Sequence, residues 1–73
     1  MKTEIYTIEN DYMGISLLVE GELVDYEDGE LPFVVIQDIS YNEKPLNLWC
    51  LSEAFIKSCQ DRIISQWLLR GRG

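Results

Sequence analysis

Residues 15–41, ISLLVEGELVDYEDGELPFVVIQDISY, decide the fold of this chain. Apolar residues recur with a period of two across the first part of the segment, which predicts one β-strand or a broken pair of strands between Tyr12 and Tyr26. An Asp-Gly pair lies within residues 27–30, between two strand-like runs, and this pair is typical of a hairpin turn. A return strand is therefore predicted over residues 33–41, antiparallel to the first.

Further elements are predicted on both sides of this hairpin. Residues 4–9 are rich in β-formers and are followed by Asn10-Asp11, a turn signal, so a first short strand is expected there. Gly21 is expected to mark a β-bulge, because the apolar positions beyond it fall in the opposite phase. A second turn is expected at residues 42–45, followed by an extended piece over residues 46–51.

A helix is predicted over residues 53–69. Ser52 is a suitable N-cap, and Glu53 lies in the first turn, where the helix dipole favours an anion. Gly71 is expected to cap the other end. The apolar stripe predicted to face the core consists of Phe55, Ile56, Cys59, Ile63 and Trp67. Together the elements predict one α+β domain over residues 1–73, an antiparallel meander of three or four strands with one C-terminal helix packed on one face.

The pattern also leaves apolar residues that one helix does not cover. The run from Phe33 to Ile36 is apolar on both faces, as in a central strand covered on both sides. Phe33, Val35 and Ile39 are expected to point away from Val34 and Ile36. Either strand twist and aromatic side chains cover this surface, or it associates with a partner or a second copy, since a chain this short buries only ~60% of its unfolded surface. The expected homodimer face consists of Phe33, Val35, Leu68 and Leu69.

The charges are strongly segregated along the chain. Its 73 residues carry a formal net charge of −7, and eleven of the 13 acidic residues lie in residues 1–43 with a single base. Such a domain is repelled by phosphate backbones, so direct binding of nucleic acid is not expected. Residues 20–30 hold six acids and no base. This run is either a solvated strand edge and turn or a surface that recognises a basic partner.

The residues available for chemistry are few. Histidine is absent, which excludes histidine-dependent catalysis and histidine metal sites. Cys50 and Cys59 have the wrong spacing for zinc and are expected in the core, as are Trp49 and Trp67. The acids after Asp25 do not match the calcium-loop pattern. A chain of this length is expected to have little room for a pocket of ~300 Å³. No catalytic residue, metal or cofactor is therefore predicted.

The location of the protein is also predicted from what the sequence lacks. No apolar run approaches the ~20 residues of a membrane span, and the N-terminus has no apolar signal-peptide core. No membrane association is expected, and the predicted location is cytoplasmic.

Recognition of another protein is the remaining class of function. Tyrosine buries a large area at low conformational cost and is common at binding hot spots, and Tyr26 lies within the acidic run. The predicted partner-binding residues are Glu20, Glu22, Asp25, Tyr26, Glu27, Asp28 and Glu30. The expected partner is a protein with a basic surface, and the resemblance given below implies that it is a host protein.

The layout of the chain resembles small acidic proteins encoded by bacteriophages and prophages. The resemblance rests on the segments from Gly14 to Tyr26 and from Val35 to Asn42, followed by Leu51-Ser52-Glu53 opening one helix. It implies a non-enzymatic inhibitor or modulator of a host defence or nucleic-acid-handling protein, of the anti-CRISPR, anti-restriction or anti-recombination type. The basic tail, Arg70-Gly71-Arg72-Gly73, departs from a uniformly acidic DNA mimic.

Overall fold

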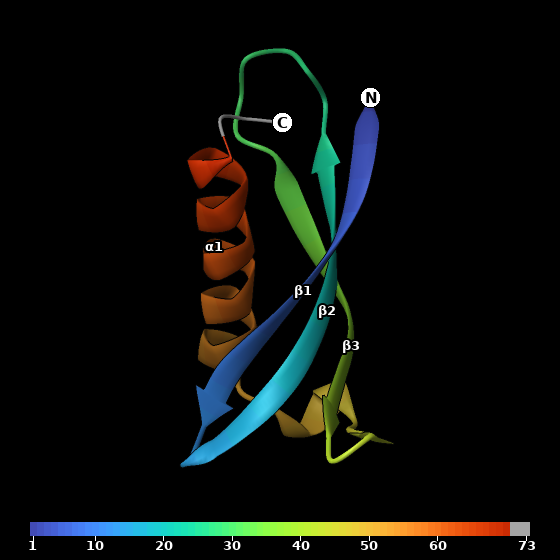
Figure 1. Cartoon of the computed structure of the whole chain (residues 1–73), viewed down its shortest axis with the longest axis vertical. Helices are drawn as coiled ribbons and strands as arrows, with labels where there is room; N and C mark the ends of the chain where they lie inside the picture. The colour runs from blue at the N-terminus through green and yellow to red at the C-terminus, as the bar shows by residue number, and fades with distance from the viewer. Residues whose placement is uncertain (71–73) are drawn as a thin grey trace.

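A four-stranded antiparallel sheet with one helix packed on one face forms the structure (Figure 1), as the sequence predicts. The computed structural model describes residues 1–70. The strands lie in the order β1-β2-β3-β4, a meander. Their bounds are β1 Lys2–Tyr12, β2 Ile15–Asp25, β3 Phe33–Tyr41 and β4 Lys44–Pro45, followed by a 3₁₀ turn η1 at Leu48–Cys50 and the helix α1 at Glu53–Leu69.

The first hairpin turns later than the sequence predicted. Met13 and Gly14 have φ values of 51° and 84°, the left-handed pair that a two-residue hairpin turn needs. The predicted turn at Asn10-Asp11 is wrong, because both residues continue β1 and pair with Leu17 and Ser16 of β2. Asn10 uses its polar side chain to reach the helix instead of making a turn.

The β2–β3 and β3–β4 connections are both close to their predicted places. The acidic segment forms a seven-residue connection, residues 26–32, which includes Gly29 with a φ of 88°, and β3 begins at Phe33 as predicted. Asn42 and Glu43 have φ values of 52° and 66° and form the next turn. This turn is shorter than the predicted one, so that residues 44–45 already pair back as β4.

A β-bulge occurs beside Gly21, but its extra residue lies on the neighbouring strand. Glu20 pairs with Asp38 whereas Gly21 pairs with Ile36, which leaves Gln37 of β3 unmatched. The side-chain alternation of β3 therefore shifts by one position at Gln37. Ile39 is fully buried as a result, on the same face as Ile36, and the prediction that it points away is wrong.

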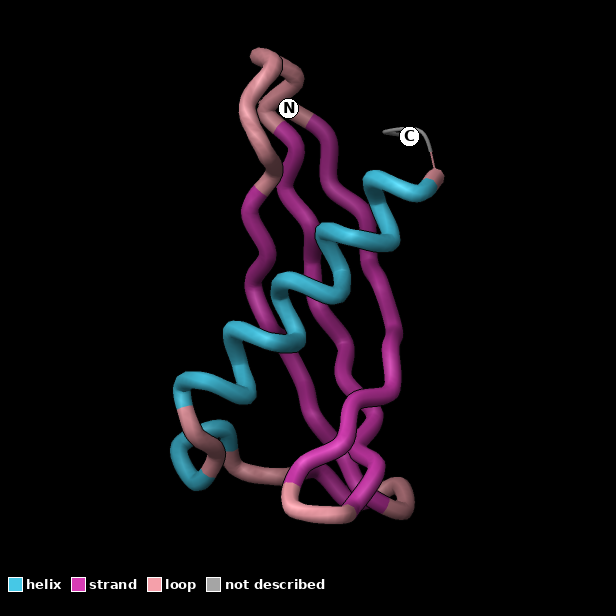
Figure 2. Tube along the Cα trace, turned by 90° about the vertical axis from the view of Figure 1, so that its left-hand side faces the viewer, coloured by secondary structure: helices cyan, strands magenta, loops and turns pink. Residues whose placement is uncertain are grey.

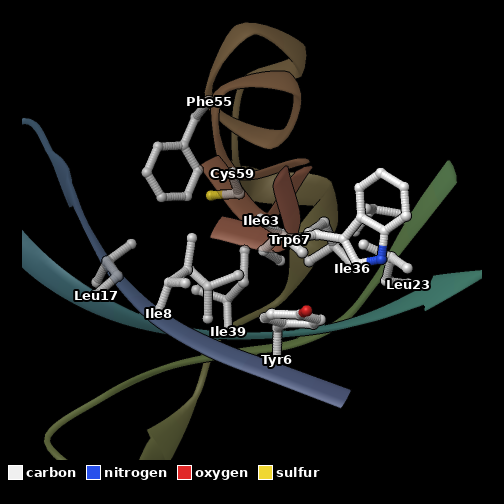
Figure 3. Packing of buried hydrophobic residues seen from close by; sticks show 12 residues of the cluster. Tyr6, Ile8, Leu17, Leu23, Ile36, Ile39, Phe55, Cys59, Ile63 and Trp67 are labelled. Carbon is white, nitrogen blue, oxygen red and sulfur yellow. The ribbon is translucent and has the colours of Figure 1, made fainter. Parts of the chain in front are cut away.

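The helix begins and ends where the sequence predicted. The Ser52 hydroxyl accepts a hydrogen bond from the Phe55 N–H at 3.2 Å and so caps the first turn. The α1 side chains that enter the core are Phe55, Cys59, Ile63 and Trp67 (Figure 3). Ile56 is only partly buried at the edge of this stripe. The expected cap at Gly71 lies outside the described residues.

Gly21 lets the helix approach the middle of the sheet. A Cβ atom at position 21 would lie 2.7 Å from Ile63 Cδ1, well inside van der Waals contact. Val34 Cγ1 and Ile36 Cδ1 would lie at 3.2 Å and 3.3 Å on the sheet side. Ile63 therefore occupies the space that a side chain at position 21 would need.

The segment before the helix differs from its prediction. It forms the 3₁₀ turn η1 because the Asn47 side chain accepts a hydrogen bond from the Trp49 N–H at 3.0 Å. This turn projects Trp49 into solvent, where its side chain is 93% exposed, and leaves Cys50 exposed as well. The core positions predicted for Trp49 and Cys50 are wrong, whereas those of Cys59 and Trp67 are confirmed.

Candidate protein-binding surface

Within residues 1–70 no α-helix packs on the sheet face opposite α1, and of the side chains in its rows only Val24 is buried. The register aligns its side chains in rows across β1, β2 and β3. These rows are Thr3–Val24–Phe33, Ile5–Glu22–Val35, Thr7–Glu20–Asp38 and Glu9–Leu18–Ser40, and we call them the open face. Phe33 and Val35 are 49% and 41% exposed on it. The prediction of a central strand covered on both sides is therefore wrong for β3.

One end of the open face is apolar. Tyr26, at the end of β2, stacks on Phe33 with ring centroids 6.5 Å apart and an interplanar angle of 5°. Ile5 and Val35 flank Glu22 in the next row and both are substantially exposed. Such a cluster of exposed apolar and aromatic side chains is typical of a surface that binds another molecule.

The other part of the open face is acidic. Glu20 and Asp38 lie directly opposite each other on neighbouring strands, and like charges in this position destabilise a sheet. Among residues 1–70 the ion pairs join Arg70 to Glu4 and the N-terminal ammonium group to Glu27, so the open-face acids take part in none of them. The described lysines and arginines lie outside these rows: Lys2 opposite Asp25, Lys44 in β4, Lys57 and Arg62 on α1, and Arg70 at its C-cap.

The acids that follow β2 have local roles in the loop. The Asp25 carboxylate accepts a hydrogen bond from the Glu27 N–H at 2.9 Å, and the Asp28 carboxylate accepts one from the Glu30 N–H at 3.1 Å. Glu27 also lies 3.8 Å from the N-terminal ammonium group. These contacts shape the loop and need no partner molecule.

The structure thus divides the seven predicted binding residues. Glu20 and Glu22 lie on the open face, and Tyr26 extends its apolar end. Asp25, the last residue of β2, lies beyond it, as do Glu27, Asp28 and Glu30 in the following loop. Asp38 and Ile5 belong to the open face but were missed, because only the pairing register brings residues so distant in sequence into the same rows.

The predicted dimer residues are also divided between two layers. Phe33 and Val35 lie on the open face, whereas Leu68 and Leu69 lie on the helix, on the other side of the sheet. The four side chains therefore do not form one surface.

A second candidate surface is a groove between α1 and β3. It has a volume of about 790 Å³, and the helix lines it with Ile56, Gln60 and Ile64. Val34 lines the strand side, and Leu48, Trp49 and Leu51 line one end. The groove is open to solvent, and its size shows that the expectation of little room for a pocket was wrong. The sequence feature that indicated this groove was Ile64, an apolar residue beside the main helical stripe.

Polar contacts close the opposite side of the helix. The Asn10 amide group donates to Ser58 Oγ and Cys59 Sγ, each at 3.3 Å, and Asn10 Oδ1 accepts from Arg62 at 3.0 Å. Arg70 donates to the Tyr6 hydroxyl at 3.0 Å. Helix α1 is thus tied to β1 by polar contacts, whereas its β3 side borders the groove.

Burial governs the titration of two groups on this side of the helix. It raises the pKa of the Cys59 thiol, against a smaller opposing effect of the hydrogen bond from Asn10. Burial also raises the pKa of Tyr6, with the neighbouring Glu4 acting in the same direction and Arg70 in the opposite one. Both groups are therefore held in their neutral forms, which suits packing.

Residues 1–70 contain neither a metal-binding cluster nor a membrane-spanning helix. In residues 1–70 no three side chains of the His, Cys, Asp or Glu type come together in a group able to hold a metal ion. Across the same residues no helix has the length and apolar character needed to cross a membrane.

Comparisons of the chain with protein-family models, with curated proteins and with solved structures found no match.

Proposed function

We propose that this protein is a non-enzymatic binding module that recognises a basic surface of a partner protein through its open face. The observation that carries the proposal is the exposure of Phe33 and Val35 beside Glu20, Glu22 and Asp38, which have no ion-pair partner among residues 1–70. In keeping with the phage-protein resemblance, the proposed role is to inhibit or modulate a host defence or nucleic-acid-handling protein in the host cytoplasm.

The two parts of the open face have complementary roles in this proposal. Burial of the exposed apolar side chains supplies affinity, at about 25 cal/mol per Å² removed from water. The carboxylates supply selectivity and a faster approach of a positively charged partner. Lysine or arginine side chains placed beside Glu20 and Asp38 also relieve the like-charge contact within the sheet.

The test compares two variants with equal net charge. The first carries Glu20→Gln and Glu22→Gln on the open face, and the matched control carries Glu27→Gln and Glu30→Gln in the loop. Each immobilised protein is exposed to bacterial lysate at low and high salt, the captured protein is identified and purified, and its affinity for each variant is measured by calorimetry.

The proposal predicts a captured protein with a basic surface whose affinity falls as salt rises, because salt screens exposed charges. The open-face variant is expected to bind more weakly than the loop variant. Equal affinities of the two variants, or a greater loss in the loop variant, would contradict the assignment of binding to the open face.

A homodimer is the second candidate function, and exposed Phe33 and Val35 favour it. Stacking two open faces brings Glu20, Glu22 and Asp38 of one copy against the same acids of the other, in a chain with a formal net charge of −7. This repulsion favours a basic partner over a second copy. The native mass of the purified protein distinguishes the two, since the dimer requires about twice the 8.5 kDa of the chain.

A further inference from the structure

The outer edge of β3 lacks a strand partner over most of its length. Strand β4 pairs only with Ser40 and Tyr41, and the Leu46 N–H extends this contact to the Ile39 carbonyl at 2.8 Å. Between Phe33 and Asp38 the described chain pairs β3 with β2 alone. An unpaired edge of this length matches a typical added strand of about five or six residues.

The backbone of this edge is oriented toward α1. Gln60 Nε2 donates a hydrogen bond to the Val34 carbonyl at 2.8 Å, so this carbonyl points away from β2. In an antiparallel strand the N–H and C=O of one residue point to the same side, and residues two apart share that side. Val34 and Ile36 therefore present their backbone groups to the outer edge, where a side-chain amide already occupies the place of a strand donor.

The groove runs beside this edge. Helix α1 crosses the sheet diagonally (Figure 2), and the groove lies between it and β3. Ile56 and Ile64 are partly buried there, on the side of the helix that faces the edge strand. An edge strand beside a helix-lined apolar groove is the arrangement in which proteins take up an extended peptide by strand addition.

We propose that the β3 edge and the groove bind an extended segment of the partner protein as an added strand, in which apolar residues alternate with lysine or arginine. This inference rests on the proposed function and names the form that the basic partner takes. Alternate side chains of a strand point to opposite faces. One set therefore enters the groove beside Ile56 and Ile64, and the other set continues the open face beside Val35 and Asp38.

Charge decides which segment fits. On the open face, side chains of the added strand lie directly beside Asp38. Glu20 and Glu22 on β2 lie one strand further away, within reach of a long basic side chain. Groove-facing positions meet mainly apolar side chains and favour apolar residues. A second copy of the chain is a poorer occupant, because its own β3 brings another Asp38 to an acidic sheet.

Binding needs one local change. The Gln60 amide must release the Val34 carbonyl, and a backbone N–H of the incoming strand then takes its place, so no buried acceptor loses its partner. Gln60→Ala removes this competitor and is expected to strengthen binding.

The test uses synthetic peptides as probes. The first is a capped eight-residue peptide of alternating valine and lysine, labelled for fluorescence anisotropy. The second has glutamate in place of lysine, and the third is the valine–lysine peptide with N-methyl groups on alternate amides, which removes strand donors on one edge. The protein variants are Ile64→Glu in the groove and Leu69→Glu, a matched control at an 87% exposed position of the same helix.

We expect the valine–lysine peptide to bind, and both N-methylation and Ile64→Glu to weaken it about tenfold or more, as the loss of one or two hydrogen bonds or a groove contact does. Leu69→Glu is expected to leave its affinity unchanged. The valine–glutamate peptide is expected to bind at least about tenfold more weakly. Circular dichroism establishes that each variant folds, and the N-methylated peptide tests the proposal on the unaltered protein.

Four results would overturn the proposal. The first three are no binding of the valine–lysine peptide, equal binding of the N-methylated peptide and equal binding of the valine–glutamate peptide. The fourth is a doubled native mass that Ile64→Glu returns to that of one chain, which would show that a second copy occupies the edge. Failure here is distinct from failure of the proposed function. A partner captured at low salt and lost with Glu20→Gln and Glu22→Gln, together with peptides that do not bind, would keep the open face as the binding surface and reject strand addition.

Discussion

Gly21→Ala tests the close packing of α1 on the sheet. The new methyl group would lie 2.7 Å from Ile63 Cδ1, and Ile63 is fully buried and cannot turn into solvent. Overpacking of this kind costs about 1–3 kcal/mol. Alanine recovers about 0.5–1 kcal/mol relative to glycine in a strand. Taking the middle of both ranges, we expect a net loss of about 1 kcal/mol in the free energy of unfolding. Urea denaturation followed by far-UV circular dichroism measures this loss.

A rescue variant separates overpacking from other effects at position 21. Ile63→Val removes the Cδ1 atom that the new methyl group meets. Alone it should cost about 0.5–1.5 kcal/mol, as deletion of a buried methyl group does. In the Gly21→Ala background it should cost nothing or restore stability, a coupling of about 1 kcal/mol. Close packing of Ile63 on Gly21 is contradicted if Gly21→Ala matches the wild-type stability, or if Ile63→Val costs the same in both backgrounds.

Three further predictions concern the helix and its surroundings. Folding favours the protonated forms of Cys59 and Tyr6, whose pKa values are raised. Their stabilising contribution is therefore complete at neutral pH and is lost as pH rises past about 9. Urea denaturation across this range should show a smaller initial decline in the free energy of unfolding for Cys59→Ala than for the wild type. Trp67→Ala should cost about 3–5 kcal/mol in the same assay, whereas Trp49→Ala should change stability by less than about 0.5 kcal/mol, and equal effects would contradict their placement. Ser52→Ala should lower the free energy of unfolding by about 1 kcal/mol through loss of the N-cap, and an unchanged value would show that another group caps the helix.

Local patterns in the sequence were sufficient to predict most of the fold. The bounds of β3 were predicted correctly because turn residues lie on both sides of its apolar run. Those of α1 were predicted correctly because an N-cap and a periodic apolar set lie close together in sequence. The position of Ile39 was not, because the unmatched residue of the bulge is Gln37, which only the β2–β3 register reveals. Trp49 was wrongly predicted to lie in the core. The turn η1 depends on a side-chain hydrogen bond, which the pattern of apolar residues does not reveal.

The candidate surface was harder to predict from the sequence than the fold was. The acidic run marked Glu20 and Glu22, but a run of charges does not distinguish a sheet face from a loop. The contribution of Asp38 depends on its pairing with Glu20 across two strands. The free edge of β3 depends on how short β4 is, and no residue within β3 itself signals that.

Amide hydrogen exchange at β3, measured with and without the valine–lysine peptide, reports directly on whether a strand adds to its outer edge. In the free protein we predict faster exchange at Val34 and Ile36, whose N–H groups face the outer edge, than at Phe33 and Val35, which face β2. Saturation with the peptide should slow Val34 and Ile36 to the rates of their neighbours. Unchanged exchange at both amides in the saturated complex would contradict strand addition at this edge.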